Sequence, residues 1–338
     1  MSLRLAVDDV TGAFAIMPTP ATPDADDPGA TDTVDVDETR RAVGALEDAG
    51  VDALMLNGTS GEAFALTPDE WRTFTEAAAD AADEMYVLAG PTTLNTRTTI
   101  ERAEFAREAG CSGLLLGRPM WNELSPDATV NFYREVADAV PELGIVAYDN
   151  PSAFKRPITS WDRLADIENF VGTKAVDLGP AYWETIRQVR AADGDARVLQ
   201  MDAYLPAALS WHTDLPLACW SSSVSCGPAP VLAMLDALEA RDYERAFALS
   251  EQMAWSFETF FPNGDMAAFG RHTPAIVKAR MREAGFLDPG PVRPPNPMTP
   301  ESYLEGGRES GRRWREIVAG VEGDGEAAEG DDEAVADQ

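Results

Sequence analysis

Between residues 12 and 240, eight short apolar runs alternate with segments of helical periodicity. The runs are almost continuously hydrophobic, as expected of parallel strands that helices cover on both faces. Such a repeated strand–helix pattern is typical of a closed barrel, so we predict an α/β fold, a (β/α)8 TIM barrel with a C-terminal helical extension. The alternative is an open doubly wound sheet, but its usual Gly-rich dinucleotide-binding turn is absent from residues 12–20.

The chain divides into three parts along its length. We predict that residues 1–240 form the barrel and that residues 241–320, with three helical segments, form the extension. Residues 321–338 contain many acidic residues, no aromatic residue and no basic residue, which predicts an acidic disordered tail. Within the barrel, residues 18–34 are rich in Pro, Asp and Gly and are expected to form a long, partly mobile loop.

The charge of the chain restricts its partners and its surroundings. The net charge is −31 and the isoelectric point is about 4.2, so the chain should repel nucleic acid and anionic membranes. No apolar run is long enough to span a membrane and the N-terminus lacks a secretory signal pattern, which predicts a cytoplasmic protein. Because 58 acidic residues outnumber 27 basic ones and only three of these are lysines, we expect a halophilic, salt-rich cytoplasm.

Cysteine and histidine are too scarce to build a metal centre. The three cysteines, Cys111, Cys219 and Cys226, have neither a metal-ligand spacing nor the pattern of a disulfide framework. The two histidines, His212 and His272, are too few for a histidine-based site. We expect neither a metal nor a cofactor.

Two reactive side chains stand on neighbouring predicted strands within Gly144–Asp177. The first apolar run of this unit ends in Tyr148, and the second contains Lys174. Adjacent strands lie roughly 5 Å apart, so both side chains should share one pocket at the carboxyl ends of the strands. An arginine could supply charge at position 174 equally well, but it cannot act as an amine nucleophile.

Each of these two residues also has a purely structural explanation. Tyr148 alone fits a core aromatic with a satisfied hydroxyl, and Lys174 alone fits a strand-end lysine paired with Asp177. Together they favour chemistry, because burial near Phe170 and Val171 should lower the lysine pKa and leave a neutral amine for Schiff-base formation. The phenol could then move protons between the intermediates.

A Gly-rich turn, Asn57-Gly58-Thr59-Ser60-Gly61, follows the second predicted strand. Its amides and hydroxyls could hold a carboxylate, although such a run also occurs in ordinary β-turns. The hydroxyl of Thr59 could hydrogen-bond the phenol of Tyr148 and help to relay its proton.

Several motifs together resemble the pyruvate-lyase superfamily that includes dihydrodipicolinate synthase and N-acetylneuraminate lyase. The resemblance covers nearly residues 12–318 and implies a (β/α)8 barrel with a C-terminal helical extension. It also implies a Schiff base between Lys174 and pyruvate or another 2-oxo acid. The motifs are Gly58-Thr59-Ser60-Gly61-Glu62, the strand end Tyr148…Asn150-Pro151, and Val171-Gly172-Thr173-Lys174.

Two departures from the family pattern argue against dihydrodipicolinate synthase activity. Those synthases usually carry a Pro-Tyr-Tyr-Asn run after strand four, whose second tyrosine serves a proton relay, whereas Trp121 occupies that place here. They also carry an arginine after strand five that holds the second substrate's carboxylate, whereas the matching position here holds Ala153.

Further motifs are similar to the hydratase-aldolases of polycyclic aromatic degradation, the trans-o-hydroxybenzylidenepyruvate hydratase-aldolase branch. These motifs include Gly117–Trp121, Trp220-Ser221-Ser222 and Phe261–Asp265. Enzymes of this branch hydrate an aryl-substituted unsaturated 2-oxo acid and cleave it to an aldehyde and pyruvate. The resemblance implies Lys174, Tyr148 and Thr59 as catalytic residues, and Asn57, Gly58, Ser60, Trp121, Asn150 and Ser222 as substrate-binding residues.

We therefore expect a Schiff-base pyruvate lyase of this hydratase-aldolase type, which binds a 2-oxo acid and an aldehyde. The alternatives are a 2-keto-3-deoxy-sugar-acid aldolase or a dihydrodipicolinate synthase-like enzyme, and, outside catalysis, a sensor that binds a 2-oxo acid. A sensor would have no need of a reactive amine at Lys174. The family resemblance further implies a homotetramer or homodimer.

Overall fold

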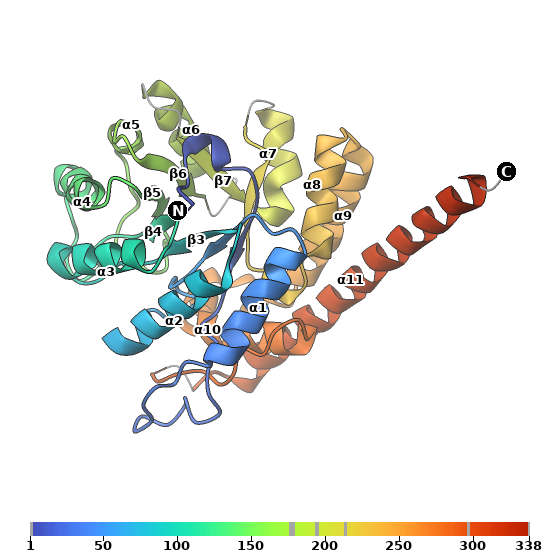
Figure 1. Cartoon of the computed structure of the whole chain (residues 1–338), viewed down its shortest axis with the longest axis horizontal. Helices are drawn as coiled ribbons and strands as arrows, with labels where there is room; N and C mark the ends of the chain where they lie inside the picture. The colour runs from blue at the N-terminus through green and yellow to red at the C-terminus, as the bar shows by residue number, and fades with distance from the viewer. Residues whose placement is uncertain (1–2, 176–179, 193–195, 213–214, 296–297, 337–338) are drawn as a thin grey trace.

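Eight parallel strands form a closed barrel at the centre of the molecule (Figure 1). The computed structural model describes residues 3–175, 180–192, 196–212, 215–295 and 298–336. Each strand pairs with the next, and the first pairs with the last, which confirms the predicted TIM barrel. The strands are β1 (Gly12–Ile16), β2 (Ala53–Met55), β3 (Tyr86–Ala89), β4 (Gly113–Leu116), β5 (Gly144–Tyr148), β6 (Phe170–Lys174), β7 (Arg197–Met201) and β8 (Ala218–Ser221).

Helices surround the barrel, and local sequence signals begin them. At the start of the second helix, Thr67 and Glu70 form a capping box that satisfies free backbone N–H groups. At the start of the fourth, the Ser125 hydroxyl accepts a hydrogen bond from the N–H of Ala128. The helices are α1 (Val36–Asp48), α2 (Pro68–Ala81), α3 (Thr96–Glu108), α4 (Pro126–Ala139), α5 (Trp161–Ala165), α6 (Pro180–Ala191), α7 (Leu205–Trp211) and α8 (Ala229–Glu239).

The strands are buried on both faces, which explains their continuous hydrophobicity. In β1, β2 and β4 nearly every residue is buried, whether it faces the barrel interior or the surrounding helices. The five residues of β6 are also all buried, and Lys174 is among them. The Lys174 amine therefore lies inside an apolar wall, where a positive charge would be costly.

Three further helices, α9 (Tyr243–Phe257), α10 (Met266–Ala284) and α11 (Glu301–Ala336), form the C-terminal extension. Helices α10 and α11 pack against each other, and the indole N–H of Trp314 donates to the carbonyl of Gly227 at 3.0 Å. Helix α11 projects beyond the barrel in Figure 1. Its helix continues over residues 321–336, where we expected disorder; glutamate and alanine, which favour helix, are frequent there.

The long loop over residues 18–34, expected to be partly mobile, packs against the rest of the molecule. Ala21 forms an isolated bridge with Val34, and Ala25 is only 1% exposed. The hydroxyl of Thr19 donates to the carbonyl of Gly61 at 2.7 Å. The loop thus contacts the Gly-rich turn that follows β2.

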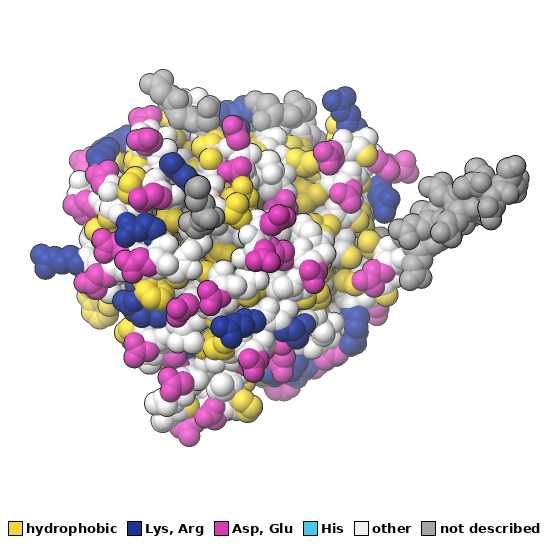
Figure 2. Space-filling model, viewed as in Figure 1, with side chains coloured by type: hydrophobic (Ala, Val, Ile, Leu, Met, Phe, Trp, Pro, Cys, Tyr) yellow, Lys and Arg dark blue, Asp and Glu magenta, His cyan; other side chains and the backbone are white. Residues whose placement is uncertain are grey.

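The surface is rich in acidic side chains. Figure 2 shows them spread over the visible face, with arginine and lysine side chains between them. Among the described helices, none has the length and hydropathy that crossing a bilayer would require.

Candidate active site

Tyr148 and Lys174 are paired residues at the carboxyl ends of β5 and β6. The Lys174 Nζ lies 5.2 Å from the centroid of the Tyr148 ring and 3.3 Å from the centroid of the Trp220 ring. The lysine is 7% exposed. The predicted juxtaposition of amine and phenol is therefore present, and the indole of β8 covers the amine from a third strand.

Burial controls the protonation of Lys174. Removal of the amine from water lowers its pKa to about 7, although the negative charge of Asp202 opposes this shift. The alternative partner considered from the sequence, Asp177, lies outside the described residues. At neutral pH a large fraction of the Lys174 amine is therefore uncharged and nucleophilic.

Two side chains, Thr59 and Asn150, contact the phenolic oxygen of Tyr148 and each other in a closed set of hydrogen bonds. Its oxygen lies 2.9 Å from the hydroxyl of Thr59, and the Asn150 amide donates to it at 2.8 Å. The same amide nitrogen also reaches the Thr59 hydroxyl at 3.1 Å. Burial raises the pKa of Tyr148, while the hydrogen bonds from Thr59 and Asn150 favour the phenolate and oppose that rise.

The Gly-rich turn presents backbone amides beside this set. Asn57, in the left-handed region with φ 55°, begins the turn, and Gly61 lets the turn close, since an added Cβ there would lie 3.1 Å from the Asn57 backbone nitrogen. Within the described residues, the amide groups of Ser60 and Gly61 donate no hydrogen bond to the protein. Unpaired N–H groups of this kind suit a carboxylate.

Some candidate residues stand apart from this centre. The Asn57 side chain donates to the Thr75 hydroxyl at 2.9 Å, which turns its amide toward α2. Trp121 is 74% exposed, and its carbonyl accepts a hydrogen bond from Lys155. Ser222 is half-buried, and its carbonyl lies 4.0 Å from the Cys226 sulfur. These three residues remain predictions as substrate contacts.

Asp202 is a buried carboxylate near the amine that the sequence analysis did not identify. It follows β7, has no exposed surface, and accepts hydrogen bonds from the Ser221 hydroxyl at 2.5 Å and the Ala203 N–H at 2.7 Å. Arg280 of α10 lies beyond it and donates to the Ser223 hydroxyl at 3.1 Å. In the sequence, Asp202 could have been identified as a carboxylate that directly follows an apolar strand.

A second buried ionic group lies directly behind the Gly-rich turn. Glu62 contacts Lys278 of α10 and Arg293 of the following segment, and each of the three side chains is at most 2% exposed. No local pattern in the sequence indicates that these three residues meet.

Two cavities adjoin this end of the barrel. A cavity of about 430 Å³ lies between the loops after β4 and β5, and Met120, Phe154 and Lys155 line it. Phe154 lies between this cavity and Tyr148, because its ring stands edge-on to the Tyr148 ring at 6.1 Å between centroids. A smaller cavity of about 240 Å³ borders Lys174 from the side of α5 and α6.

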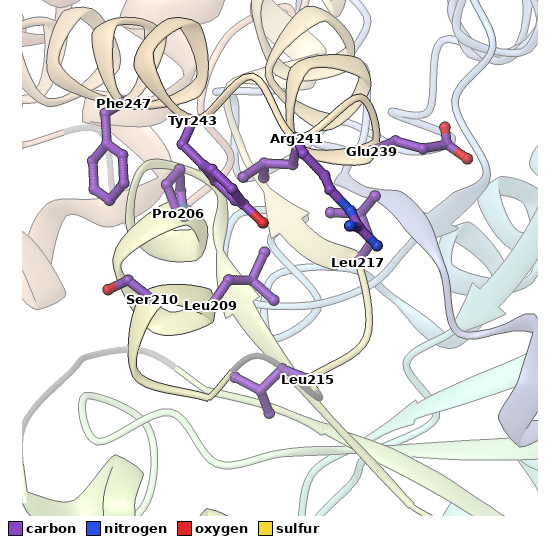
Figure 3. Close-up of a pocket in the computed structure, with 10 residues that line it drawn as sticks. Pro206, Leu209, Ser210, Leu215, Leu217, Glu239, Arg241, Tyr243 and Phe247 are labelled. Atoms are coloured by element: carbon purple, nitrogen blue, oxygen red, sulfur yellow. The ribbon is translucent and has the colours of Figure 1, made fainter.

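A larger cavity, of about 650 Å³, lies elsewhere, between α7 and the α8–α9 connection (Figure 3). Leu209, Leu217 and Tyr243 point into it. None of the described candidate-site residues lines this cavity, so the volume of a cavity alone does not identify the candidate active site.

Comparison with known proteins agrees with this geometry. The defining pattern of the Dihydrodipicolinate synthetase family matches residues 15–303. A trans-2'-carboxybenzalpyruvate hydratase-aldolase of Nocardioides sp. (strain KP7) is 39% identical over 91% of this chain and 94% of its own. A trans-O-hydroxybenzylidenepyruvate hydratase-aldolase of Sphingobium xenophagum is 40% identical over 92% of this chain and 95% of its own.

A solved structure described as PhdJ bound to substrate intermediate is similar along almost the whole chain. It superposes with a TM-score of 0.91 at 41% identity, and covers 94% of this chain and 99% of its own.

Proposed function

This chain belongs to the Dihydrodipicolinate synthetase family, and we propose that it is a Schiff-base hydratase-aldolase that cleaves aryl-substituted benzylidenepyruvates to an aldehyde and pyruvate. The family membership makes it a class I pyruvate-dependent lyase. The relatives that match more than nine-tenths of the chain are hydratase-aldolases by name, and they supply the substrate class.

One observation carries the assignment of the chemistry to particular residues. The Lys174 amine is buried, its pKa is lowered to about 7, and it lies beside a hydrogen-bonded phenol on the adjacent strand. An amine nucleophile and a proton carrier are the two groups that imine chemistry needs.

The reaction begins when the neutral Lys174 amine attacks the 2-oxo carbon of the substrate. A carbinolamine forms, and loss of water gives a protonated imine. Tyr148, held by Thr59 and Asn150, accepts and returns the protons of these steps. The substrate carboxylate binds the amides of Ser60 and Gly61.

The protonated imine then acts as an electron sink twice. Water first adds to the aryl-bearing carbon of the conjugated double bond, and the neighbouring carbon gains a proton. Next, Tyr148 removes the proton of the new hydroxyl, the carbon–carbon bond breaks, and its electrons enter the imine to give an enamine. Protonation and hydrolysis release pyruvate and restore Lys174, so one water is consumed overall.

The residues around the distal cavity support an aryl substrate. Met120 and Phe154 offer apolar surface in a cavity of about 430 Å³. A polyhydroxylated sugar acid would leave hydroxyl groups without partners against these two side chains, although Asn122, Lys155 and Arg156 also line the cavity. At Ala153 the chain lacks the arginine that resemblance assigns to dihydrodipicolinate synthases.

A panel of aldehydes condensed with pyruvate tests the substrate class. We expect kcat/KM for 2-hydroxybenzaldehyde and 2-carboxybenzaldehyde to exceed that for glyceraldehyde by about two orders of magnitude, the scale of specificity that apolar contacts supply. The assays should be run in concentrated salt. A preference for glyceraldehyde would instead favour the 2-keto-3-deoxy-sugar-acid aldolase.

We further infer a cytoplasmic homotetramer or homodimer. Exposed aromatic side chains support self-association: Trp211, Tyr243 and Phe247 are 52%, 55% and 39% exposed. Tyr243 and Phe247 border the cavity of Figure 3. Light scattering coupled to size exclusion would measure the mass, and a monomer at all salt concentrations would contradict the inference.

A further inference from the structure

The carboxylate-binding turn is anchored by an ionic cluster that reaches into the C-terminal extension. Glu62, which ends the turn, is fully buried. Its Oε2 lies 2.5 Å from the Nζ of Lys278 and 2.8 Å from a guanidinium nitrogen of Arg293. Its Oε1 accepts the backbone N–H of Arg293 at 2.8 Å. One side chain thus joins residues that are 231 positions apart.

The backbone of the turn needs such an anchor. Asn57 and Glu62, at its two ends, have φ angles of 55° and 54°, a conformation that residues other than glycine rarely adopt. Such conformations persist where the surroundings hold them. Three hydrogen-bonded contacts on the Glu62 carboxylate supply that restraint.

Arg293 extends the restraint to the long loop. Its guanidinium donates to the Thr33 hydroxyl at 2.8 Å and to the Thr19 carbonyl at 3.1 Å. The Thr19 hydroxyl in turn donates to the Gly61 carbonyl at 2.7 Å. Arg293 therefore restrains Gly61 in two ways. It binds the side chain of the next residue, Glu62, and it binds the carbonyl of Thr19, whose hydroxyl contacts the Gly61 carbonyl.

Lys278 completes the cluster from α10. It is 1% exposed, and it also donates to the Pro291 carbonyl at 2.7 Å. The charged groups that face it are Glu62, Arg293 and, on its own helix, Arg282. A further acid, Glu70, bonds the Thr33 hydroxyl at 2.5 Å and so lies on the far side of Arg293.

We propose that Lys278 and Arg293 are positioning residues for substrate-carboxylate binding: by holding Glu62, they keep the amides of Ser60 and Gly61 directed at the carboxylate of the 2-oxo acid. This inference rests on the proposed function. It makes the C-terminal extension a part of the binding site without direct contact with the substrate.

Loss of this positioning should weaken the binding of the 2-oxo acid. The carboxylate is bound equally in the ground state and the transition state, because it takes no part in bond making. We expect Lys278→Gln to raise KM for pyruvate about tenfold, the scale of one lost charged hydrogen bond. kcat should stay within about twofold.

Arg282→Gln is the matched control. It removes one positive charge from the same helix, but the Arg282 side chain is 57% exposed and its carboxylate partner Asp288 is 3.8 Å away. KM for pyruvate should not change in this variant. A Lys278→Gln enzyme with the KM of the Arg282→Gln enzyme would overturn the proposal, as would a loss confined to kcat.

A pH experiment tests the proposal even where Lys278→Gln fails to fold. Burial lowers the pKa of Lys278 to about 8, so the amine is charged below that pH and neutral above it. KM for pyruvate of the unmodified protein should rise as the pH passes 8. Lys278→Arg, whose charge persists, should remove the rise. A KM that stays flat between pH 7 and about 9.5 in the unmodified protein would overturn the proposal.

Failure of the proposed function and failure of the positioning role give different results. If borohydride traps no pyruvate on the unmodified protein, the proposed function itself is wrong. If trapping occurs but KM responds to neither Lys278 nor pH, only the positioning role is wrong.

Discussion

Lys174 and Tyr148 are register partners on β6 and β5, with the amine nitrogen 5.2 Å from the centre of the phenol ring. In the mechanism that we propose, this pairing places a nucleophile and a proton carrier at one end of the barrel. The amine is buried and partly neutral, while Thr59 and Asn150 hold the phenol, which supports the two roles that we propose.

Tyr148→Phe tests the role of the phenol. It removes the proton carrier, so kcat should fall by about 10²–10⁴ while the fold is kept. Tyr133→Phe is a matched control, because that buried phenol donates to the Leu116 carbonyl at 2.7 Å and has no contact with the amine. The control should lose about 1 kcal/mol of stability and keep its kcat. Equal kcat values in the two variants would remove Tyr148 from the mechanism.

The pKa of Lys174 predicts the acidic limb of the pH profile. The amine is protonated below about pH 7 and cannot attack the 2-oxo carbon, so kcat/KM should rise with pH through that value. Initial rates over a pH series in constant salt would measure the limb. A rise centred near the ordinary lysine value, above pH 10, would show that burial does not tune this amine.

Substitution of Asp202 should shift the acidic limb of the pH profile. Its negative charge raises the pKa of Lys174 against the effect of burial, so Asp202→Asn should move the limb to lower pH. Ser221→Ala removes the 2.5 Å hydrogen bond to Asp202 but keeps the charge, and should leave the limb nearly in place. If the acidic limb of the kcat/KM profile lies at the same pH in Asp202→Asn as in the unmodified protein, this carboxylate does not act on the amine.

Salt should stabilise the fold strongly. With a net charge of −31, self-repulsion opposes the compact state at low ionic strength. The screening length shortens from about 10 Å at 0.1 M salt to about 3 Å at 1 M, so the melting temperature should rise across this range. A melting temperature independent of salt would contradict the halophilic interpretation.

The barrel and its reactive pair could be predicted from the sequence because both depend on local patterns. Continuous apolar runs separated by helical segments define the strands, and the scarcity of lysine draws attention to Lys174. The Thr59 contact followed from placing two strand ends on one face of a barrel. These inferences need only neighbouring strands, which the alternation of elements supplies.

The groups that support the site were not predictable in this way. Glu62 and Arg293 are in contact although they lie 231 positions apart, and no spacing or periodicity in the sequence indicates such a contact. Asp202 gained its importance from burial beside Arg280, which depends on how α10 packs on the barrel.

Covalent trapping tests the central claim most directly. Borohydride added with pyruvate should reduce the imine and attach one pyruvyl group to the protein, and peptide mass analysis should place it on Lys174. Lys174→Arg should abolish the adduct, because arginine cannot form it, while Lys155→Arg should trap pyruvate as the unmodified protein does. An unchanged protein mass, or an adduct that survives Lys174→Arg, would contradict the account.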